Sequence, residues 1–395
     1  MSTIFRLIII WSATLPLVTL NNSYEGPKIV FFLIGGVLLF VFWILFLWSK
    51  KVNLKKVDYA FLLWLVIMLA SSLMGVHPID SILGSSYRHQ GILFFLVLFV
   101  LGKTIEGFSL KLKNLLIKSI IISIVIQSLV VILISPIGTI GEANSVAGFL
   151  VIGSTFVQKS RYKIVLLPII LIAIIVTGSR SGLAIFAIVT FTNLIRSKYL
   201  VSLAGVGFVL ISILGAYLEK NVSAFESRFT IWSLAFKTIR ERPLLGFGAE
   251  TNEVVFGEMF ARVNLPLHEL IVERSHNLFL DVAIWSGLIG LAAFTLWLVM
   301  VAKKIAKHDH VLFIGLVGWL LFAFVQPIGV SHWVILTILT SLPRHFVCRN
   351  EFPLYETTTP LQTLPPLHFP KRGLSFWRLF SSRLQGQLNQ PNTFL

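Results

Sequence analysis

The stretch ERSHNLFLDVAIWSGLIGL, Glu273 to Leu291, passes from a charged run to an apolar run within a few residues. His276 and Asn277 stand at the change, and Asp281 is the one ionisable residue in the apolar run, which continues to residue 301. A helix of about 20 apolar residues is long enough to cross the hydrocarbon core of a bilayer. The stretch therefore predicts a membrane-spanning helix with polar side chains at its mouth.

The composition of the whole chain agrees with this prediction. The 395 residues are 56% hydrophobic and 13% charged, with a mean hydropathy of +0.87. Strands of a membrane β-barrel would alternate polar and apolar residues in segments of about ten, and no such alternation occurs. The expected fold is an all-α, polytopic membrane protein.

About twelve apolar stretches are predicted to span the membrane, and several of them are short. They form one transmembrane domain over residues 1–343, and a Pro- and Thr-rich tail follows at 344–395, where little structure is expected. The predicted spans are 4–20, 28–48, 57–76, 91–105, 115–135, 145–158, 163–178, 182–195, 199–217, 277–301, 311–327 and 331–343.

The basic residues between these spans predict the orientation. With the N-terminus in the cytoplasm, the inside loops hold 16 Lys and Arg, whereas the short outside loops hold only Lys28, Arg88 and Arg180. Such an excess is typical of cytoplasmic loops, so both termini are expected inside the cytoplasmic membrane. The net charge of +16 is therefore explained by membrane topology, and a nucleic-acid partner is not expected.

One outside loop, 218–275, is long enough to carry structure of its own. Phe229, Trp232, Phe236 and Ile239 recur with helical spacing, which predicts an amphipathic helix lying at the outer membrane surface. A small extracytoplasmic cap packed on itself, which would also bury that apolar face, explains the same pattern equally well.

Three outward arginines are candidates for binding a substrate. Arg180 lies in TGSRSG, a very tight turn between two spans whose glycines let another group approach closely. Arg88, in SSYRHQG, precedes a span, and Arg228 opens the predicted amphipathic helix. For each arginine, a simple contact with solvent or lipid headgroups is the alternative explanation.

The histidine at the mouth of the tenth span is a candidate general base. Ser275 is a possible N-cap there, and the helix dipole disfavours a protonated ring at that position, so His276 should be neutral. Asn277 and Asp281 are four residues apart and are expected on one face, where Asp281 orients its neighbours or receives a proton. An interfacial polar tip is the alternative role of the histidine.

Metal and nucleotide chemistry have no visible site. The four aspartates are Asp58, Asp80, Asp281 and Asp309, and no outward pair of carboxylates has the spacing of a metal site. LGKT at 101–104 lacks the upstream glycine of a phosphate-binding loop. No cofactor is therefore expected.

Four ordered segments resemble the O-antigen ligase and polymerase family, and the resemblance covers roughly residues 80–340. They are GEANSVAG at 141–148, TGSRSGLA at 177–184, SRFTIWSLAFKTIRERPLLGFGAET at 227–251 and SHNLFLDVAIWSGLIGL at 275–291. The resemblance implies transfer of a glycan from a polyprenyl diphosphate carrier to an acceptor hydroxyl at the outer face of the inner membrane, without ATP.

The resemblance also implies residue roles. Arg180 and Arg228 stand in the places of arginines that engage the diphosphate, and His276 stands in the place of the histidine that activates the acceptor. Arg88 and Asn277 are further candidates for substrate binding, and Asp281 is a candidate catalytic residue beside His276. The acceptor is a lipid-linked sugar, a protein hydroxyl or another glycan, so a protein O-oligosaccharyltransferase is an open alternative. A transporter or flippase is the alternative from another class, although no internal repeat is visible.

Overall fold

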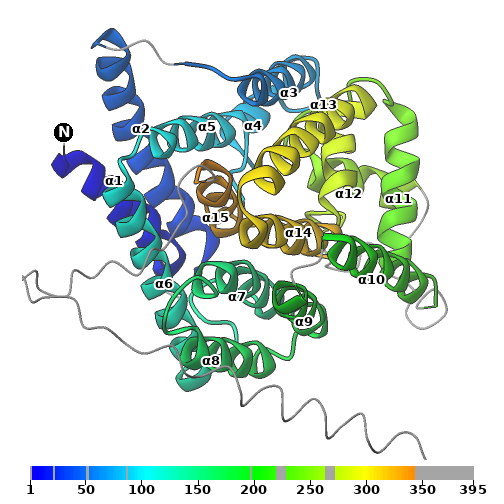
Figure 1. Ribbon diagram of the computed structural model, residues 1–395. Helices are drawn as coiled ribbons and strands as arrows, with labels where there is room; N and C mark the ends of the chain where they lie inside the picture. Colours follow the sequence, from blue (N-terminus) through cyan, green and yellow to red (C-terminus); the bar gives the residue numbers. More distant parts are fainter. Residues whose placement is uncertain are drawn as a thin grey trace, which may run out of the picture. The chain divides into compact units, whose positions relative to one another are not determined.

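The computed structural model is all-helical over the residues it describes, as the sequence predicts (Figure 1). These described residues contain no β-strand, and the only β-pairing among them is an isolated bridge between Leu20 and Ser23. The tail at 344–395 lies outside the described residues, as do two parts of the long loop. The structure describes residues 2–20, 23–49, 53–85, 88–195, 198–218, 228–262 and 272–342.

A helix occupies each of the twelve apolar stretches. Four are long and apolar enough to cross a membrane, namely α2 (Glu25–Ser49), α3 (Lys56–Leu73), α6 (Leu110–Leu133) and α13 (Leu278–His308). The remaining eight are α1 (Ser2–Thr14), α5 (Ile92–Glu106), α7 (Ala143–Val157), α8 (Lys163–Val176), α9 (Arg180–Ile195), α10 (Lys198–Leu218), α14 (His310–Val325) and α15 (Val330–Ser341).

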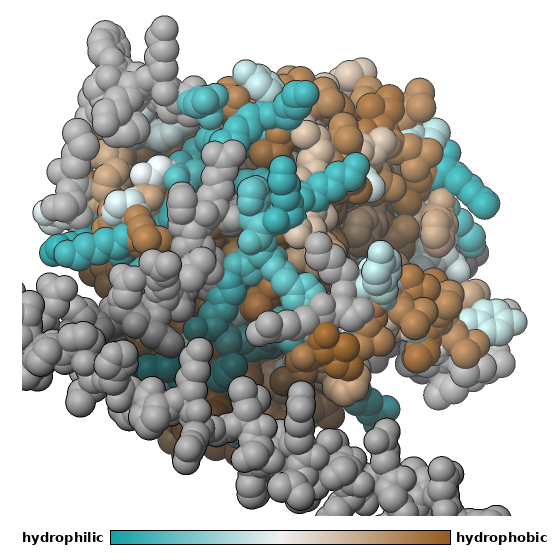
Figure 2. Space-filling model, in the orientation of Figure 1, coloured by the Kyte–Doolittle hydropathy of each residue, from teal (hydrophilic) through white to brown (hydrophobic). Residues whose placement is uncertain are grey.

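Hydrophobic side chains cover much of the surface, as expected for a protein that faces lipid. Ile34 and Leu38 on α2, and Leu210 and Ile211 on α10, are each at least 60% exposed. Figure 2 shows hydrophobic residues over much of one face, interrupted by a band of hydrophilic ones. An aqueous environment would penalise so much exposed apolar area, so these helices belong to a membrane protein.

The short helices outside the predicted spans are η1 (Leu15–Leu17), α4 (Pro78–Leu83), α11 (Arg228–Glu241) and α12 (Asn252–Arg262). Helix α11 is the amphipathic helix expected in the long loop, but its buried face agrees with the predicted one only in part. The buried residues include Ile231, Leu234 and Ile239, whereas Phe236 is 55% exposed. The helix packs against α13 and α12, and the aliphatic side chains fit this contact, so the segment is packed on the protein.

The described loops gather at two ends of the helices. At the first end, which we call the His276 end, Lys28 Nζ donates to Thr139 O at 2.6 Å and Gln90 Nε2 donates to Ile328 O at 3.0 Å. These contacts join loops that the distribution of basic residues places outside.

The opposite end, which we call the lysine-rich end, joins the loops predicted to be inside. Glu106 accepts from Lys55 at 2.6 Å and from Lys304 at 2.7 Å, and Lys159 pairs with Asp309. The contacts between loops therefore divide the loops into the same two groups, outside and inside, as the distribution of basic residues does.

Helix α13 differs from the single span expected at 277–301, because it is broken at Gly287. This residue has φ 64° and ψ −172°, which is not helical. It lies about 14 Å along the helix from Leu278, at 1.5 Å per residue. A break at that depth frees backbone N–H and C=O groups where no bulk water can satisfy them.

The loop between α11 and α12 satisfies these groups with its own backbone. Phe247 N donates to Ile284 O at 2.8 Å, and Gly248 N donates to Trp285 O at 2.9 Å. In the other direction, Leu288 N donates to Pro243 O at 2.8 Å. Residues 243–248 thus form an inserted loop that completes the hydrogen bonding of the broken helix.

Glycines at both sides of this contact allow the two backbones to meet. A Cβ on Gly246 would lie 2.4 Å from Ile284 O, and a Cβ on Gly287 would lie 2.1 Å from Leu244 O. Gly246 also has φ 71°, a left-handed conformation that glycine adopts without strain. The close contact between the two backbones therefore explains the first glycine of GFG, at 246–248, and the glycine of SGL, at 286–288.

Replacing Gly246 by alanine should destabilise the fold. The new Cβ must displace a backbone oxygen and adopt a positive φ, which together should cost at least about 2 kcal/mol. Thermal unfolding of purified Gly246→Ala protein should begin well below that of wild type. Gly257→Ala is the control, because Gly257 is helical and has no atom within 4 Å of its would-be Cβ. Equal stability of the two variants would contradict the role given to Gly246.

Candidate active site

The N-terminus of α13 is capped by Asn277, so the prediction of Ser275 as the cap was wrong. Asn277 Oδ1 accepts from Phe279 N at 3.0 Å and from Leu280 N at 3.3 Å. Ser275 Oγ is occupied elsewhere, because its one O–H is shared between Asn277 O and Asp281 Oδ1, both at 2.7 Å. The cap leaves the amide N–H groups of Asn277 available to another acceptor.

His276 lies between these two polar residues in a strained backbone conformation. Its φ is 54°, which a residue with a side chain rarely adopts. Ser275 and Asn277 on either side are buried, while the histidine itself is partly exposed. The hydrogen bonds of the two neighbours hold the backbone in this conformation, and such strain is typical of functional sites.

Asp281 anchors the residue that precedes the histidine. Its side chain is 2% exposed, and Oδ1 accepts from Ser275 N at 2.8 Å, Ser275 Oγ at 2.7 Å and Asn252 Nδ2 at 2.7 Å. Asn252 in turn accepts from Trp285 Nε1. With three donors on one oxygen, Asp281 fixes the geometry around His276.

A buried ion pair fixes the chain one residue further before the histidine, at Arg274. Arg274 pairs with Glu250, and its guanidinium lies 4.5 Å from the centre of the Trp285 ring. Glu250 also accepts from Ser85 Oγ at 2.8 Å, and Arg274 reaches Gln90 Oε1 at 3.4 Å. Both side chains are buried, so loss of either one would leave the charge of the other buried without a partner.

The inserted loop leads directly to Glu250 and Asn252, the two residues that hold Arg274 and Asp281. Residues 243–248 are fixed in the break of α13, and the chain then reaches Glu250 and Asn252 within four residues. Glu250 holds Arg274, and Asn252 holds Asp281. The broken helix and the inserted loop therefore build one frame around His276.

The sequence analysis did not identify Glu250, Asn252 or Arg274 as site residues. Glu250 and Arg274 are charged residues beside the GFG and SHN sequences, so their place in those motifs was a usable signal. No sequence pattern marks Asn252, because its role depends on a hydrogen bond to Asp281, which lies 29 residues further along the chain.

Two of the predicted arginines lie within electrostatic reach of His276. Arg88 donates from Nε to Glu273 Oε2 at 3.3 Å, and its side chain is 12% exposed. Arg228 is the first residue of α11. Their charges disfavour protonation of the neighbouring ring.

The pKa of His276 is lowered from its ordinary value. Burial is the main cause, and the positive charges of Arg228 and Arg88 act in the same direction. Asp281 and Glu142 oppose the shift with their negative charges. The ring is therefore neutral at pH 7, as a general base requires.

Arg180 lies at the exposed first turn of α9, which is tied to the start of α7. Ser179 Oγ donates to Asn144 Oδ1 at 2.7 Å, and a Cβ on Gly182 would lie 2.5 Å from that of Ala147. Within the described part of the chain, Arg180 makes no hydrogen bond or ion pair with protein. Its guanidinium is therefore free to meet a ligand.

The start of α7 also links this turn to the histidine. Glu142 is the N-cap residue of α7 and accepts from Ser145 Oγ at 2.7 Å. The carboxylate acts electrostatically on both Arg88 and His276. The described site thus brings His276, Arg88 and Arg228 together, and α7 connects them to the helix that carries Arg180.

Among the described residues, no three His, Cys, Asp or Glu side chains gather as a metal site would require.

Comparison with known families gives a match to part of the chain. Residues 164–295 match the family model described as O-Antigen ligase. The matched segment contains Arg180, Arg228 and His276, together with the inserted loop and the frame residues Glu250, Asn252 and Arg274. The resemblance to O-antigen ligases is thereby confirmed. No curated protein gives a significant match.

Removing Glu250 should expose the dependence of the frame on its buried ion pair. Glu250→Leu leaves the Arg274 cation buried without a partner, which should lower the free energy of unfolding by about 3 kcal/mol or more. The double variant Glu250→Leu/Arg274→Met should recover part of this loss. Denaturant unfolding in detergent provides the measurement.

Glu258→Leu is the matched control for this experiment. Glu258 pairs with Arg262 at 3.5 Å, and both side chains are more than half exposed. The loss of such a surface pair should cost less than about 1 kcal/mol. If the two single variants lose equal stability, the Arg274–Glu250 pair is not a structural anchor.

Proposed function

We propose that this protein, which resembles O-antigen ligases over residues 164–295, transfers a glycan from a polyprenyl diphosphate carrier to an acceptor hydroxyl. The observation that carries the proposal is a neutral His276, held at the mouth of α13 within electrostatic reach of Arg88 and Arg228. No nucleotide or metal is needed, because the diphosphate carrier is already an activated leaving group.

The proposed setting is the outer face of the cytoplasmic membrane. Twelve spans would place both termini in the cytoplasm and the loop 218–275 outside. Two observations support this arrangement, namely the excess of basic residues in alternate loops and the gathering of the same loops at the lysine-rich end. The His276 end then faces the compartment where a lipid-linked donor and an aqueous acceptor meet.

In the proposed reaction the acceptor oxygen attacks the anomeric carbon of the donor sugar. Its proton passes to the unprotonated ring nitrogen of His276, and the bond between the anomeric carbon and the diphosphate oxygen breaks. The electron pair leaves with the polyprenyl diphosphate. The buried Asp281 keeps the histidine in place, and its charge stabilises the imidazolium that forms.

The arginines would stabilise the negative charge of the leaving diphosphate. A guanidinium binds phosphate oxygens through two parallel N–H groups and stays charged near lipid. Arg180 is exposed and free for this role, whereas Arg228 and Arg88 lie nearer His276. Asn277 uses its side-chain oxygen for the helix cap, so its amide N–H groups would donate to a substrate oxygen.

An O-antigen ligase-like enzyme and a protein O-oligosaccharyltransferase differ in the acceptor that they use. A protein O-oligosaccharyltransferase would use the same donor and the same base, with a protein Ser or Thr as the acceptor. The loop 218–275 is the segment expected to select between these acceptors.

A transporter or flippase is the alternative that the break in α13 favours, because transporters use broken helices near the middle of the membrane. In transporters, however, the unwound backbone lines a cavity. Here the freed backbone groups are bonded to residues 243–248. The break therefore serves as a fixed support, which favours the enzyme.

The topology can be checked by labelling single cysteines from each side of the membrane. Cys348 is the one native cysteine, and a variant without it provides the background. Lys111→Cys should react only after the membrane is opened, whereas Glu258→Cys should react in intact cells. Both positions reacting from the same side would overturn the proposed orientation.

Arg180 should require its guanidinium. If it grips a diphosphate with two N–H groups, Arg180→Lys should reduce transfer almost as much as Arg180→Ala. A loss of about tenfold or more is expected, since a hydrogen bond to a charged group contributes about 1.5–3 kcal/mol. Transfer is measured as glycan joined to the acceptor in cells, with Arg240→Lys, an exposed position on α11, as the control. Full activity of Arg180→Lys would instead support a simple lipid contact.

His276→Ala should abolish most transfer while the protein stays folded. Loss of a general base typically reduces the rate by about 10²–10⁴. Cells should accumulate the lipid-linked glycan, and the exposed His77 provides the control variant His77→Ala.

The pH profile gives an independent check of the same residue. The neutral ring is the active form and its pKa is lowered, so wild-type activity should fall only as the pH drops below about 6.5, the ordinary histidine value. Residual activity of His276→Ala should lack this limb. An unchanged rate or profile in the variant would exclude His276 as the base.

A further inference from the structure

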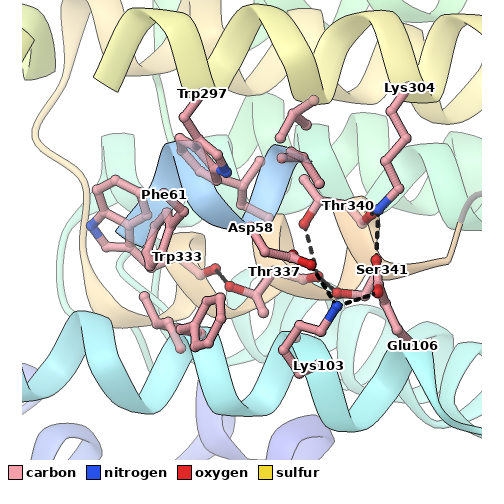
Figure 3. Close-up of a pocket in the computed structure, with 16 residues that line it drawn as sticks. Asp58, Phe61, Lys103, Glu106, Trp297, Lys304, Trp333, Thr337, Thr340 and Ser341 are labelled. Atoms are coloured by element: carbon pink, nitrogen blue, oxygen red, sulfur yellow. Dashed lines mark hydrogen bonds and ion pairs between the residues drawn. The ribbon is translucent and has the colours of Figure 1, made fainter. Parts of the chain in front are cut away.

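A second polar site lies at the lysine-rich end, far from His276 along the helices. It is a cavity of about 70 Å³ between α3, α5, α13 and α15 (Figure 3). One enclosed water needs about 10–15 Å³ of such space, so the cavity has room for a group larger than water. Nothing in the proposed transfer reaction uses it.

The charged cluster at the polar wall of this cavity holds a surplus of positive charge. Glu106 accepts from Lys55 at 2.6 Å, from Lys103 at 2.8 Å and from Lys304 at 2.7 Å. Lys103 also donates to Asp58 at 2.8 Å. Lys103, Lys304, Asp58 and Glu106 line the cavity, and Lys55 pairs with Glu106 from beside it. This cluster therefore holds three ammonium groups and two carboxylates, and an added anion would balance its charge.

The lysines also keep hydrogen-bond donors for such an anion. An ammonium group has three N–H donors. In the described structure Lys103 uses two of them, on Asp58 and Glu106, and Lys304 uses two, on Glu106 and on Thr340 O at 3.2 Å. One N–H on each lysine remains to bind an oxygen, as a phosphate would provide.

The other wall is apolar. Leu98, Val301 and Leu336 line it, and Figure 3 shows Phe61 and Trp297 on the side away from Glu106. A free inorganic anion gains nothing from such a wall, whereas the glycerol and acyl part of a phospholipid is complementary to it.

We propose that this cavity binds the phosphate of an anionic phospholipid from the cytoplasmic leaflet. The surplus charge and the spare N–H groups of Lys103 and Lys304 hold the phosphate, and the apolar wall holds the adjoining lipid. Basic pockets between membrane helices on the cytoplasmic side are known to bind acidic headgroups. The bound lipid would join α5 to α13, the helix whose other end positions His276.

The test is thermal unfolding of the delipidated full chain in a neutral detergent, titrated with phosphatidylglycerol or phosphatidylcholine. Phosphatidylglycerol should raise the melting temperature and phosphatidylcholine should not. Lys304→Gln should weaken the apparent affinity for phosphatidylglycerol about fivefold, as expected for one lysine at an anionic surface. Lys303→Gln is the matched control, because Lys303 is exposed on the same helix and does not line the cavity.

A second variant separates lipid binding from loss of the ion pairs. Thr337→Leu adds volume to the cavity wall and leaves every charge in place, so it should also weaken the phosphatidylglycerol effect. Equal losses in Lys303→Gln and Lys304→Gln would overturn the proposal, because they would indicate diffuse surface charge. Equal stabilisation by phosphatidylcholine would also overturn it. Inorganic phosphate that acts as strongly through Lys304 would assign the cavity to a free anion instead.

Discussion

The backbone hydrogen bonds between the broken helix α13 and residues 243–248 are the constraint on which the candidate site depends. A helix interrupted inside the membrane must find partners for its freed N–H and C=O groups, and here another segment of the same chain supplies them. The contact requires glycine at positions 246 and 287, because any Cβ there would displace a backbone atom. Once the loop is fixed, Glu250 and Asn252 reach the residues on either side of His276. The need to satisfy backbone hydrogen bonds inside the membrane thereby also fixes the residues around His276.

The electrostatics of the site follow from this frame. Asp281 and Glu250 are buried acids, and each is held in place by hydrogen-bond donors. His276 is the partly exposed group with a lowered pKa, and it lies beside cations that suit a phosphorylated substrate. In the proposed reaction the roles of base and anion binder therefore fall to different residues. A site that only contacted lipid headgroups would not need a strained histidine backbone fixed from both sides.

The sequence predicted the helical class and the place of every main helix, because long apolar runs have few alternatives in a membrane protein. It also predicted the helix at 228–241, but only part of the face that it buries, since Phe236 and Ile231 are equally apolar and only tertiary packing chooses between them. The break at Gly287 was not predicted, because the apolar run continues on both sides of it and no proline marks it. His276, Arg88 and Arg228 were predicted and lie close together, whereas the partners Glu250 and Asn252 depend on contacts across the chain.

Reconstitution with a labelled lipid-linked donor tests the central claim most directly. Purified protein in liposomes would receive the donor and an acceptor glycan in the presence of a chelator and without nucleotide. The account predicts that glycan appears on the acceptor together with an equal amount of free polyprenyl diphosphate. Movement of the intact donor across the bilayer without cleavage of its glycosyl bond would contradict the account and indicate a flippase. A requirement for added metal or nucleotide would contradict the chemistry assigned to His276 and the arginines.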